Sequence, residues 1–276
     1  MAIVLQPASR EALAEAEASL DRYVDGASKG DLERLGEELF AVTRLLAGEP
    51  SLRRHLADPS VPAASRSGLA DRVLADQLSR PTLDVVSEVV SSRWSRPADL
   101  LEALEVLARR AALGVAEKDG TLDEVEDQLF RFGRILDREP RLNALLTDHA
   151  APADKRVELL RGLLGDRVSP VTATLLANTV RNPRGRSLDR AAEELSELAA
   201  ARRDRYVAHV RAPVRLTAEQ EHRLAESLTR LYGRPMSLQI ELDPDLLGGL
   251  VVRVGGEIID GSVAGKLAAA RRRLPG

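Results

Sequence analysis

The chain has 276 residues, with 40 Lys and Arg against 43 Asp and Glu and a formal net charge of −3 at pH 7. This length allows two or three domains, and the slightly acidic balance argues against a general nucleic-acid binder, which needs excess positive charge to displace counterions. The sequence contains no cysteine, so disulfides, thiolate catalysis and cysteine-ligated metals are excluded.

The sequence contains no apolar run of membrane-spanning length. The apolar opening Ala2–Leu5 is far shorter than the core of a signal peptide. No other run approaches the roughly 18 apolar residues of a spanning helix. We therefore expect a cytosolic chain that reaches a membrane only through a partner.

Most of the chain, up to about Arg205, carries the apolar spacing of amphipathic helices. Apolar residues recur three and four positions apart, as in Leu32, Leu35 and Leu39. Glycines and prolines interrupt this pattern at short intervals. We expect about ten helices of roughly 8–20 residues, joined by short loops into an antiparallel bundle.

This helical part repeats itself. A shift of 90 residues superposes Glu37–Ser79 on Asp127–Ser169, with 16 identities in 43 positions. The matches fall on core positions and on helix boundaries, so the repeated object is a folded unit. Under the same shift the first helix, near Ser9–Asp25, maps onto Asp99–Val115. We therefore expect one helix to end the first copy and also to begin the second.

After Arg205 the pattern changes to the short alternating stretches of strands. Thr217, with Gln220 three residues later, forms a capping-box pattern at the start of one helix, and Gly255-Gly256 suits a tight hairpin. The expected elements are, in order, a strand at Tyr206–Arg211, a helix at Thr217–Tyr232, strands at Met236–Leu242, Gly249–Val254 and Glu257–Asp260, and a helix at Val263–Leu274.

The sequence therefore predicts a mostly α fold in three parts. Two tandem helical-bundle units, related by the 90-residue offset, occupy 1–105 and 106–205. A small α+β domain of order β-α-β-β-β-α occupies 206–276.

The segment Gly261–Lys266 resembles a phosphate-binding loop only in part. That loop needs Gly, four residues and then Gly-Lys-Ser/Thr. Here Asp260 stands at the position of the first glycine, where a carboxylate would repel phosphate, and Leu267 stands where Ser or Thr must bind magnesium. A capped structural helix explains the segment better than a nucleotide site.

No set of residues predicts a catalytic or metal site. The four histidines lack metal-ligand spacing, and paired acids such as Glu37-Glu38 suit solvated helix faces better than acid–base chemistry. The run Arg271–Arg273 could bind an anion, but the negative end of the last helix explains it as well and is preferred. Trp94 suits core packing better than a binding anchor. We expect no catalytic residue, no metal and no cofactor.

The most specific signal is the stretch Leu247–Leu267. It combines a glycine pair, an apolar strand ending in a basic residue, a glycine turn, and Asp-x-Ser-apolar before a basic residue and Leu; the residues are Gly248-Gly249, Arg253, Gly255, Asp260, Ser262, Val263, Lys266 and Leu267. This stretch closely resembles the carboxyl-terminal signature of the delta subunit of F-type ATP synthase, the family of the mitochondrial oligomycin-sensitivity-conferring protein.

The resemblance extends over essentially the whole chain, with two departures. Typical members have one amino-terminal helical domain, whereas this chain carries the second copy. Members often have aromatic residues in the first helix, where Ala12 and Glu17 stand here.

The resemblance implies a non-catalytic stator subunit of the peripheral stalk. In that family the amino-terminal helical domain sits on the α3β3 head and binds amino-terminal segments of the α subunits, while the carboxyl-terminal domain holds the b subunits. The head is thereby kept from turning with the rotor during proton-driven ATP synthesis. The resemblance further implies one copy per complex at the cytoplasmic face of the plasma membrane, with the anchor in a separate b-type chain and no nucleic acid.

Candidate contact residues follow from this resemblance. In the first bundle the candidates for an α-subunit-binding groove are Leu13, Leu20, Val85, Val86 and Val89, although core packing explains the same residues equally well. The carboxyl-terminal signature for binding the stalk consists of Gly249, Arg253, Gly255, Asp260, Ser262 and Lys266. Most of these suit fixing the hairpin and helix start, and Arg253 and Lys266 could face the stalk.

Two other classes of function remain open. A helical-repeat adaptor or regulatory protein unrelated to ATP synthase would be favoured by a basic stripe on one bundle face. A metabolic enzyme would require a deep pocket with perturbed ionisable groups.

Overall fold

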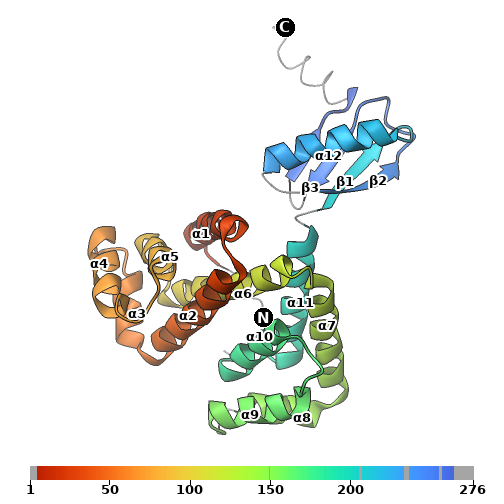
Figure 1. Ribbon diagram of the computed structural model, residues 1–276. Helices are drawn as coiled ribbons and strands as arrows, with labels where there is room; N and C mark the ends of the chain where they lie inside the picture. Colours follow the sequence, from red (N-terminus) through yellow and green to blue (C-terminus); the bar gives the residue numbers. More distant parts are fainter. Residues whose placement is uncertain are drawn as a thin grey trace. The chain divides into compact units, whose positions relative to one another are not determined.

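The computed structural model describes residues 5–148, 150–183, 185–204, 207–232, 236–254 and 257–263. The fold is mostly helical and forms two compact units, Met1–Ala199 and Ala200–Gly276 (Figure 1). The helices of the first unit are α1 (Pro7–Gly26), α2 (Lys29–Gly48), α3 (Pro50–Ala57), α4 (Ala63–Leu74), α5 (Arg80–Ser91), α6 (Pro97–Lys118), α7 (Leu122–Arg138), α8 (Pro140–Thr147), α9 (Ala153–Leu164), α10 (Pro170–Arg181) and α11 (Leu188–Asp204), whose last residues enter the second unit.

Local sequence explains where these helices begin. Helices α1, α3, α6, α8 and α10 have proline in their first turn, where its fixed φ suits a helix and its missing N–H costs nothing. Helix α2 begins with a capping box, in which the Ser28 side chain accepts from the Asp31 backbone N–H and the Asp31 carboxylate accepts from the Ser28 N–H.

Helix α6 is the central element of the helical unit. It runs between α1–α5 and α7–α10 (Figure 1), and all residues from Asp99 to Ala116 except Val106 and Arg110 are buried. A helix that is buried on nearly every side requires neighbours on nearly every side. Helix α2 packs along it through Gly36, which lies against Ala108 and Ala112.

The 90-residue repeat of the sequence recurs in the helix bounds. Helices α3, α4 and α5 begin and end 90 residues before α8, α9 and α10, and α1 begins at Pro7 where α6 begins at Pro97. Helix α6 therefore holds the last position of the first half and the first position of the second half. The division expected at residue 105 falls inside this helix.

Matching side-chain contacts accompany these bounds. Buried Arg66 donates from Nη1 to the carbonyl oxygen of Val90 at 2.6 Å, and buried Arg156, 90 residues later, donates from Nη1 to that of Val180 at 2.7 Å. Each guanidinium satisfies carbonyl groups that a helix end leaves without an intrahelical partner. The two arginines thus fix α4 to α5 and α9 to α10.

The second unit contains a four-stranded sheet and one described helix, α12 (Ala218–Tyr232). The strands are β1 (Val207–Ala212), β2 (Ser237–Leu242), β3 (Val251–Val254) and β4 (Glu257–Asp260), in the spatial order β2-β1-β3-β4. Strand β1 pairs with β2 in parallel, and the other pairs are antiparallel. One face of the sheet packs on α12 through a small core of Ala208, Val210, Leu228, Met236, Val252 and Val254.

The structure of this unit can be compared with two features predicted from the sequence. The capping box is confirmed, since the Thr217 N–H donates to Gln220 Oε1 at 2.9 Å and the Gln220 N–H donates to Thr217 Oγ1. Strand β3 begins at Val251 and not at Gly249, because Gly248 and Gly249 have positive φ. The hairpin glycines Gly255-Gly256 and the last helix beyond Val263 lie outside the described residues.

Among the described residues, no helix combines the length and apolar character that crossing a membrane requires.

Candidate functional site

The five residues predicted to line a groove lie between α1 and α5. Leu20, Val86 and Val89 are buried in the core, whereas Leu13 and Val85 are partly exposed at its edge. The Ser19 hydroxyl on α1 donates to Glu88 Oε2 on α5 at 2.8 Å and holds the two helices together. Of the predicted set, Leu13 and Val85 are therefore the residues that a partner can reach.

Helix α1 is attached to α6 by an ionic contact beside this surface. Arg110 on α6 contacts Glu17 at 3.0 Å and Asp21 at 3.3 Å. Burial raises the pKa of the Glu17 carboxyl, and the Arg110 charge opposes that rise. These ion pairs hold α1 against α6.

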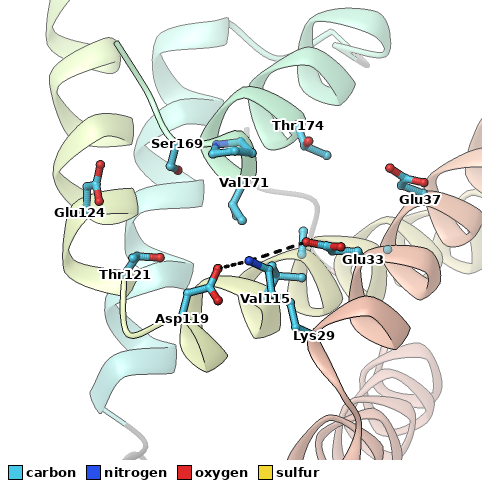
Figure 2. A pocket seen from close by; sticks show the side chains of 13 residues that line it. Lys29, Glu33, Glu37, Val115, Asp119, Thr121, Glu124, Ser169, Val171 and Thr174 are labelled. Atoms are coloured by element: carbon cyan, nitrogen blue, oxygen red, sulfur yellow. Dashed lines mark ion pairs between the residues drawn. The ribbon is translucent and has the colours of Figure 1, made fainter. Parts of the chain in front are cut away.

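A cavity of about 420 Å³ opens between the two halves of the helical unit (Figure 2). Its floor is apolar, and carboxylates lie around it. The lining residues are Lys29, Glu33, Gly36 and Glu37 of α2, Ala112, Val115 and Asp119 at the end of α6, Thr121 and Glu124 at the start of α7, and Ser169, Pro170, Val171 and Thr174 of α10. The size lies in the usual range of ligand pockets.

Among the described residues, Lys29 is the single basic residue of this lining. Its ammonium lies 2.7 Å from Asp119 Oδ2 and 4.0 Å from Glu33 Oε1, as Figure 2 shows. Its hydrogen bond to Asp119 raises the pKa of Lys29 above the ordinary value. Because Glu33, Glu37, Asp119 and Glu124 outnumber it, this cavity is net negative.

A buried ionic network lies elsewhere along α6. Arg186, before α11, contacts Glu102 at 2.9 Å and Glu194 at 3.0 Å. Arg109 pairs with Glu105 one helical turn away, and burial lowers the pKa of Arg109 despite that carboxylate. Burial also acts to lower the pKa of Arg186, but the charges of Glu102 and Glu105 raise it overall. The network ties the second half to α6.

In the second unit, the signature residues form a tight junction at the end of the sheet. The Val263 N–H donates to the Gly248 carbonyl at 2.9 Å, and the Gly261 N–H donates to that of Leu250 at 2.9 Å. Gly249 has φ +79°, and a Cβ there would lie 2.9 Å from Ser262 Cα and would also meet the Gly261 carbonyl oxygen. Gly249 therefore serves the fold.

Asp260 and Ser262 belong to the same junction. Asp260 Oδ1 accepts from the Ser262 N–H at 2.9 Å, and the hydrogen bonds from Ser262 lower the pKa of Asp260. Arg253 is different, because it is exposed and pairs in register with His209 and Ile258. It lies on the sheet face opposite α12. Gly255 and Lys266 lie outside the described residues.

Sequence reasoning missed the cavity and the ionic network, because each forms only when helices far apart in the chain meet. The sequence did carry one signal of the buried contacts that fix α4 to α5 and α9 to α10. Arg66 and Arg156 are identical at the 90-residue offset, and a basic residue repeated within apolar helices indicates a shared buried role.

The described residues contain no group of three His, Cys, Asp or Glu side chains placed to hold a metal ion. What they offer is surfaces and cavities suited to binding. Residues 107–274 match the family model described as ATP synthase delta (OSCP) subunit.

Curated relatives match almost the whole chain. "ATP synthase subunit delta" of Streptomyces griseus is 48% identical over 272 residues, which cover 99% of this chain and 100% of the relative. The protein of the same name from Streptomyces avermitilis is 49% identical, with 97% of each chain covered. "ATP synthase subunit b-delta" of Mycobacterium sp. (strain KMS) is 46% identical over 98% of this chain and 61% of its own length.

A solved structure of the Toxoplasma gondii mitochondrial ATP synthase hexamer contains a chain that is 20% identical and has a TM-score of 0.35. The match covers 63% of this chain and 99% of that one. This structural overlap is too small to support an argument.

Proposed function

The chain belongs to the ATP synthase delta (OSCP) subunit family, and we propose that it is a non-catalytic stator subunit of an F-type ATP synthase. In this role it links the α3β3 head to b-type subunits of the peripheral stalk, so that the head resists the torque of the rotor during ATP synthesis. The observation that carries the proposal is the 48% identity over 99% of the chain, which includes both helical halves and the sheet unit.

The helical unit would hold the head. The surface between α1 and α5 offers Leu13 and Val85 beside a buried apolar core, which suits the apolar face of a partner helix. We assign it to the amino-terminal segments of α subunits. The two repeats, expected at residues 1–105 and 106–205, would share helix α6.

The unit that begins near residue 206 would hold the b subunits. A relative named "b-delta" combines both names in one protein and matches 98% of this chain, which supports a position beside a b-type chain. The sheet face opposite α12 carries Arg253 and exposed Ile258, so it offers both a charge and an apolar contact. We assign stalk binding to this face.

The same assignment gives the chain its place in the cell. It would be a peripheral subunit, one per complex, held at the cytoplasmic face of the plasma membrane through its partners. Its work is mechanical, so its interfaces must dissociate slowly.

Affinity purification of the tagged full-length chain from native membranes tests the proposal. We expect α, β and b-type subunits to co-elute in stoichiometric amounts. Leu13→Glu with Val85→Glu should reduce recovery of α, and Arg253→Glu should reduce recovery of b. Exposed Arg141 on α8 provides the matched control as Arg141→Glu, which should change neither. Recovery of the chain without any of these subunits would overturn the proposal.

A further inference from the structure

The cavity of Figure 2 is one end of a longer groove between α2 and α10. Beyond it lies a second cavity of about 290 Å³, lined by Glu37, Phe40, Arg44, Arg161, Thr174, Ala177, Asn178 and Arg181. Glu37 and Thr174 line both cavities, so the two adjoin along α2 and α10.

The spacing between α2 and α10 is fixed where the groove ends. The Arg44 guanidinium on α2 donates to Asn178 Oδ1 on α10 at 3.0 Å. A space of only about 10 Å³ remains around this contact, between Phe40 and the helices α6 and α10. Phe40 itself is 4% exposed. The groove is therefore preformed and closed at this end, which lowers the entropic cost of filling it.

The two ends of the groove carry opposite charge. At the first end Lys29 pairs with Asp119 and Glu33, and Glu124 lines the same cavity. Arg44, Arg161 and Arg181 outnumber Glu37 at the second end, where Arg181 also contacts Asp154 at 3.0 Å. Burial lowers the pKa of Arg44, and the like charge of Arg181 lowers it further. A negative charge placed there would relieve this repulsion.

The length and floor of the groove indicate the size of an occupant. From Val171 to Asn178 the wall of α10 spans about two turns, or roughly 10 Å. Gly36, Ala112 and Val115 provide an apolar floor at the acidic end, and Val171 of α10 points into the cavity from the other side in Figure 2.

We propose that this groove binds a short segment of a partner polypeptide that carries a basic residue at one end, an acidic residue about two helical turns away, and an apolar side chain facing the floor. The basic residue lies toward Glu33 and Glu124, and the acidic residue lies toward Arg44 and Arg161. The opposite charges fix the direction of the segment. This inference rests on the proposed function, because the partner is sought within the assembled ATP synthase.

A single introduced cysteine tests it, since the chain has none of its own. Thr174 lines both cavities, so Thr174→Cys reports on the middle of the groove. Maleimide labelling of this variant should be roughly tenfold slower in the purified complex than in the isolated chain, because a bound segment removes most of the pocket surface from solvent. Equal rates in the two states would overturn the inference.

Identification of the occupant follows from the same cysteine. A maleimide–diazirine cross-linker attached to it in the complex should capture one peptide of another subunit that contains the two charges at the stated spacing. Cross-links only within this chain, or to a peptide without those charges, would contradict the proposal. So would protection without any peptide cross-link, which points to a small molecule.

Charge reversal distinguishes a groove that a charged segment occupies from one that is merely covered in the complex. Glu33→Lys with Glu124→Lys, or Arg161→Glu, should restore most of the labelling in the complex. The matched controls Glu197→Lys and Arg141→Glu change exposed residues of the same types outside the groove and should leave the protection intact. If the reversals leave it intact as well, the charges do not select the occupant and the inference is wrong.

The two proposals can fail separately. If the chain does not purify with α, β and b-type subunits, the proposed function fails. If it does so while Thr174→Cys remains freely labelled, only the inference about the groove fails.

Discussion

Gly249 has a backbone conformation that few other residues can adopt. Its φ of +79° and the closeness of Gly261 and Ser262 leave no room for a side chain. Other glycines of the chain are different, since Gly68 in α4 has nothing within 4 Å of the position a Cβ would take. The sequence pattern found Gly249 by resemblance, and its conformation gives the physical reason for a glycine there.

Gly249→Ala should lower the free energy of unfolding of the sheet unit by about 2 kcal/mol, because it adds backbone strain and a steric clash. Gly68→Ala is the matched control and should raise that of the helical unit by up to about 1 kcal/mol, since alanine favours a helix interior. Urea unfolding followed by circular dichroism measures both. A neutral Gly249→Ala would show that the junction can relax.

Arg186 and Arg190 both contact the Glu194 carboxylate, but they differ in how exposed they are. Arg186 is 12% exposed and also pairs with Glu102, whereas Arg190 is 55% exposed. We expect Arg186→Ala to cost about 3 kcal/mol of unfolding free energy, because it breaks the buried ion pair with Glu102.

Arg190→Ala, as the control, should cost less than about 1 kcal/mol, as exposed ion pairs do. Denaturant titration of both variants gives the comparison. Equal costs would mean that the network contributes no more than a surface pair.

At the scale of helices and strands, helix-boundary residues and apolar periodicity predicted most of the fold. Prolines marked the starts of α3, α8 and α10, and the capping box marked α12. Periodicity could not show which apolar residues would remain accessible. Leu20 and Leu13 lie on the same face of α1, and only packing against α5 and α6 decides that the first is buried and the second partly exposed.

At one equivalent position, the two halves of the helical unit make the same contact with different residues. Glu38 Oε2 accepts from the Ser79 N–H at 2.9 Å in the first half, and Gln128 Oε1 accepts from the Ser169 N–H at 2.9 Å in the second. Burial acts to raise the pKa of Glu38, but the hydrogen bonds from Ser79 and Thr82 lower it overall. The amide of Gln128 makes the equivalent contact without a charge.

This difference predicts that this contact makes stability depend on pH in the first half and not in the second. Because the pKa of Glu38 is lowered on folding, its contribution to stability is present above the ordinary value of 4.5 and is lost as pH falls through the lowered pKa. Glu38→Gln should remove that loss, and Gln128→Glu should add a similar one to the second half. Urea midpoints between about pH 6 and about pH 3 measure the change. Identical pH slopes in all three proteins would refute the assignment.

At the scale of the whole molecule, the described residues form two separate hydrophobic cores of very different size. The core of the helical unit extends from Ala12 to Ala199, whereas the described core of the sheet unit has six buried residues. The inequality follows from the predicted domain lengths, whereas the groove between α2 and α10 does not follow from the sequence pattern. The groove depends on how helices distant in the chain pack together.

Scanning calorimetry should therefore resolve two unfolding transitions, with the sheet unit melting first because a small core buries less apolar surface. Gly249→Ala should move only the lower transition, and Arg186→Ala only the upper one. A single cooperative transition, shifted by both variants, would show that the units unfold together.

The sharing of α6 also limits which segments can be deleted from this protein. A deletion that removes α6 together with either half takes from the other half a helix that it needs, because residues 97–118 serve both. A repeat joined by a linker can be cut anywhere in that linker and leave an intact domain. Here, by contrast, a shortened chain keeps a complete half only when α6 stays with it.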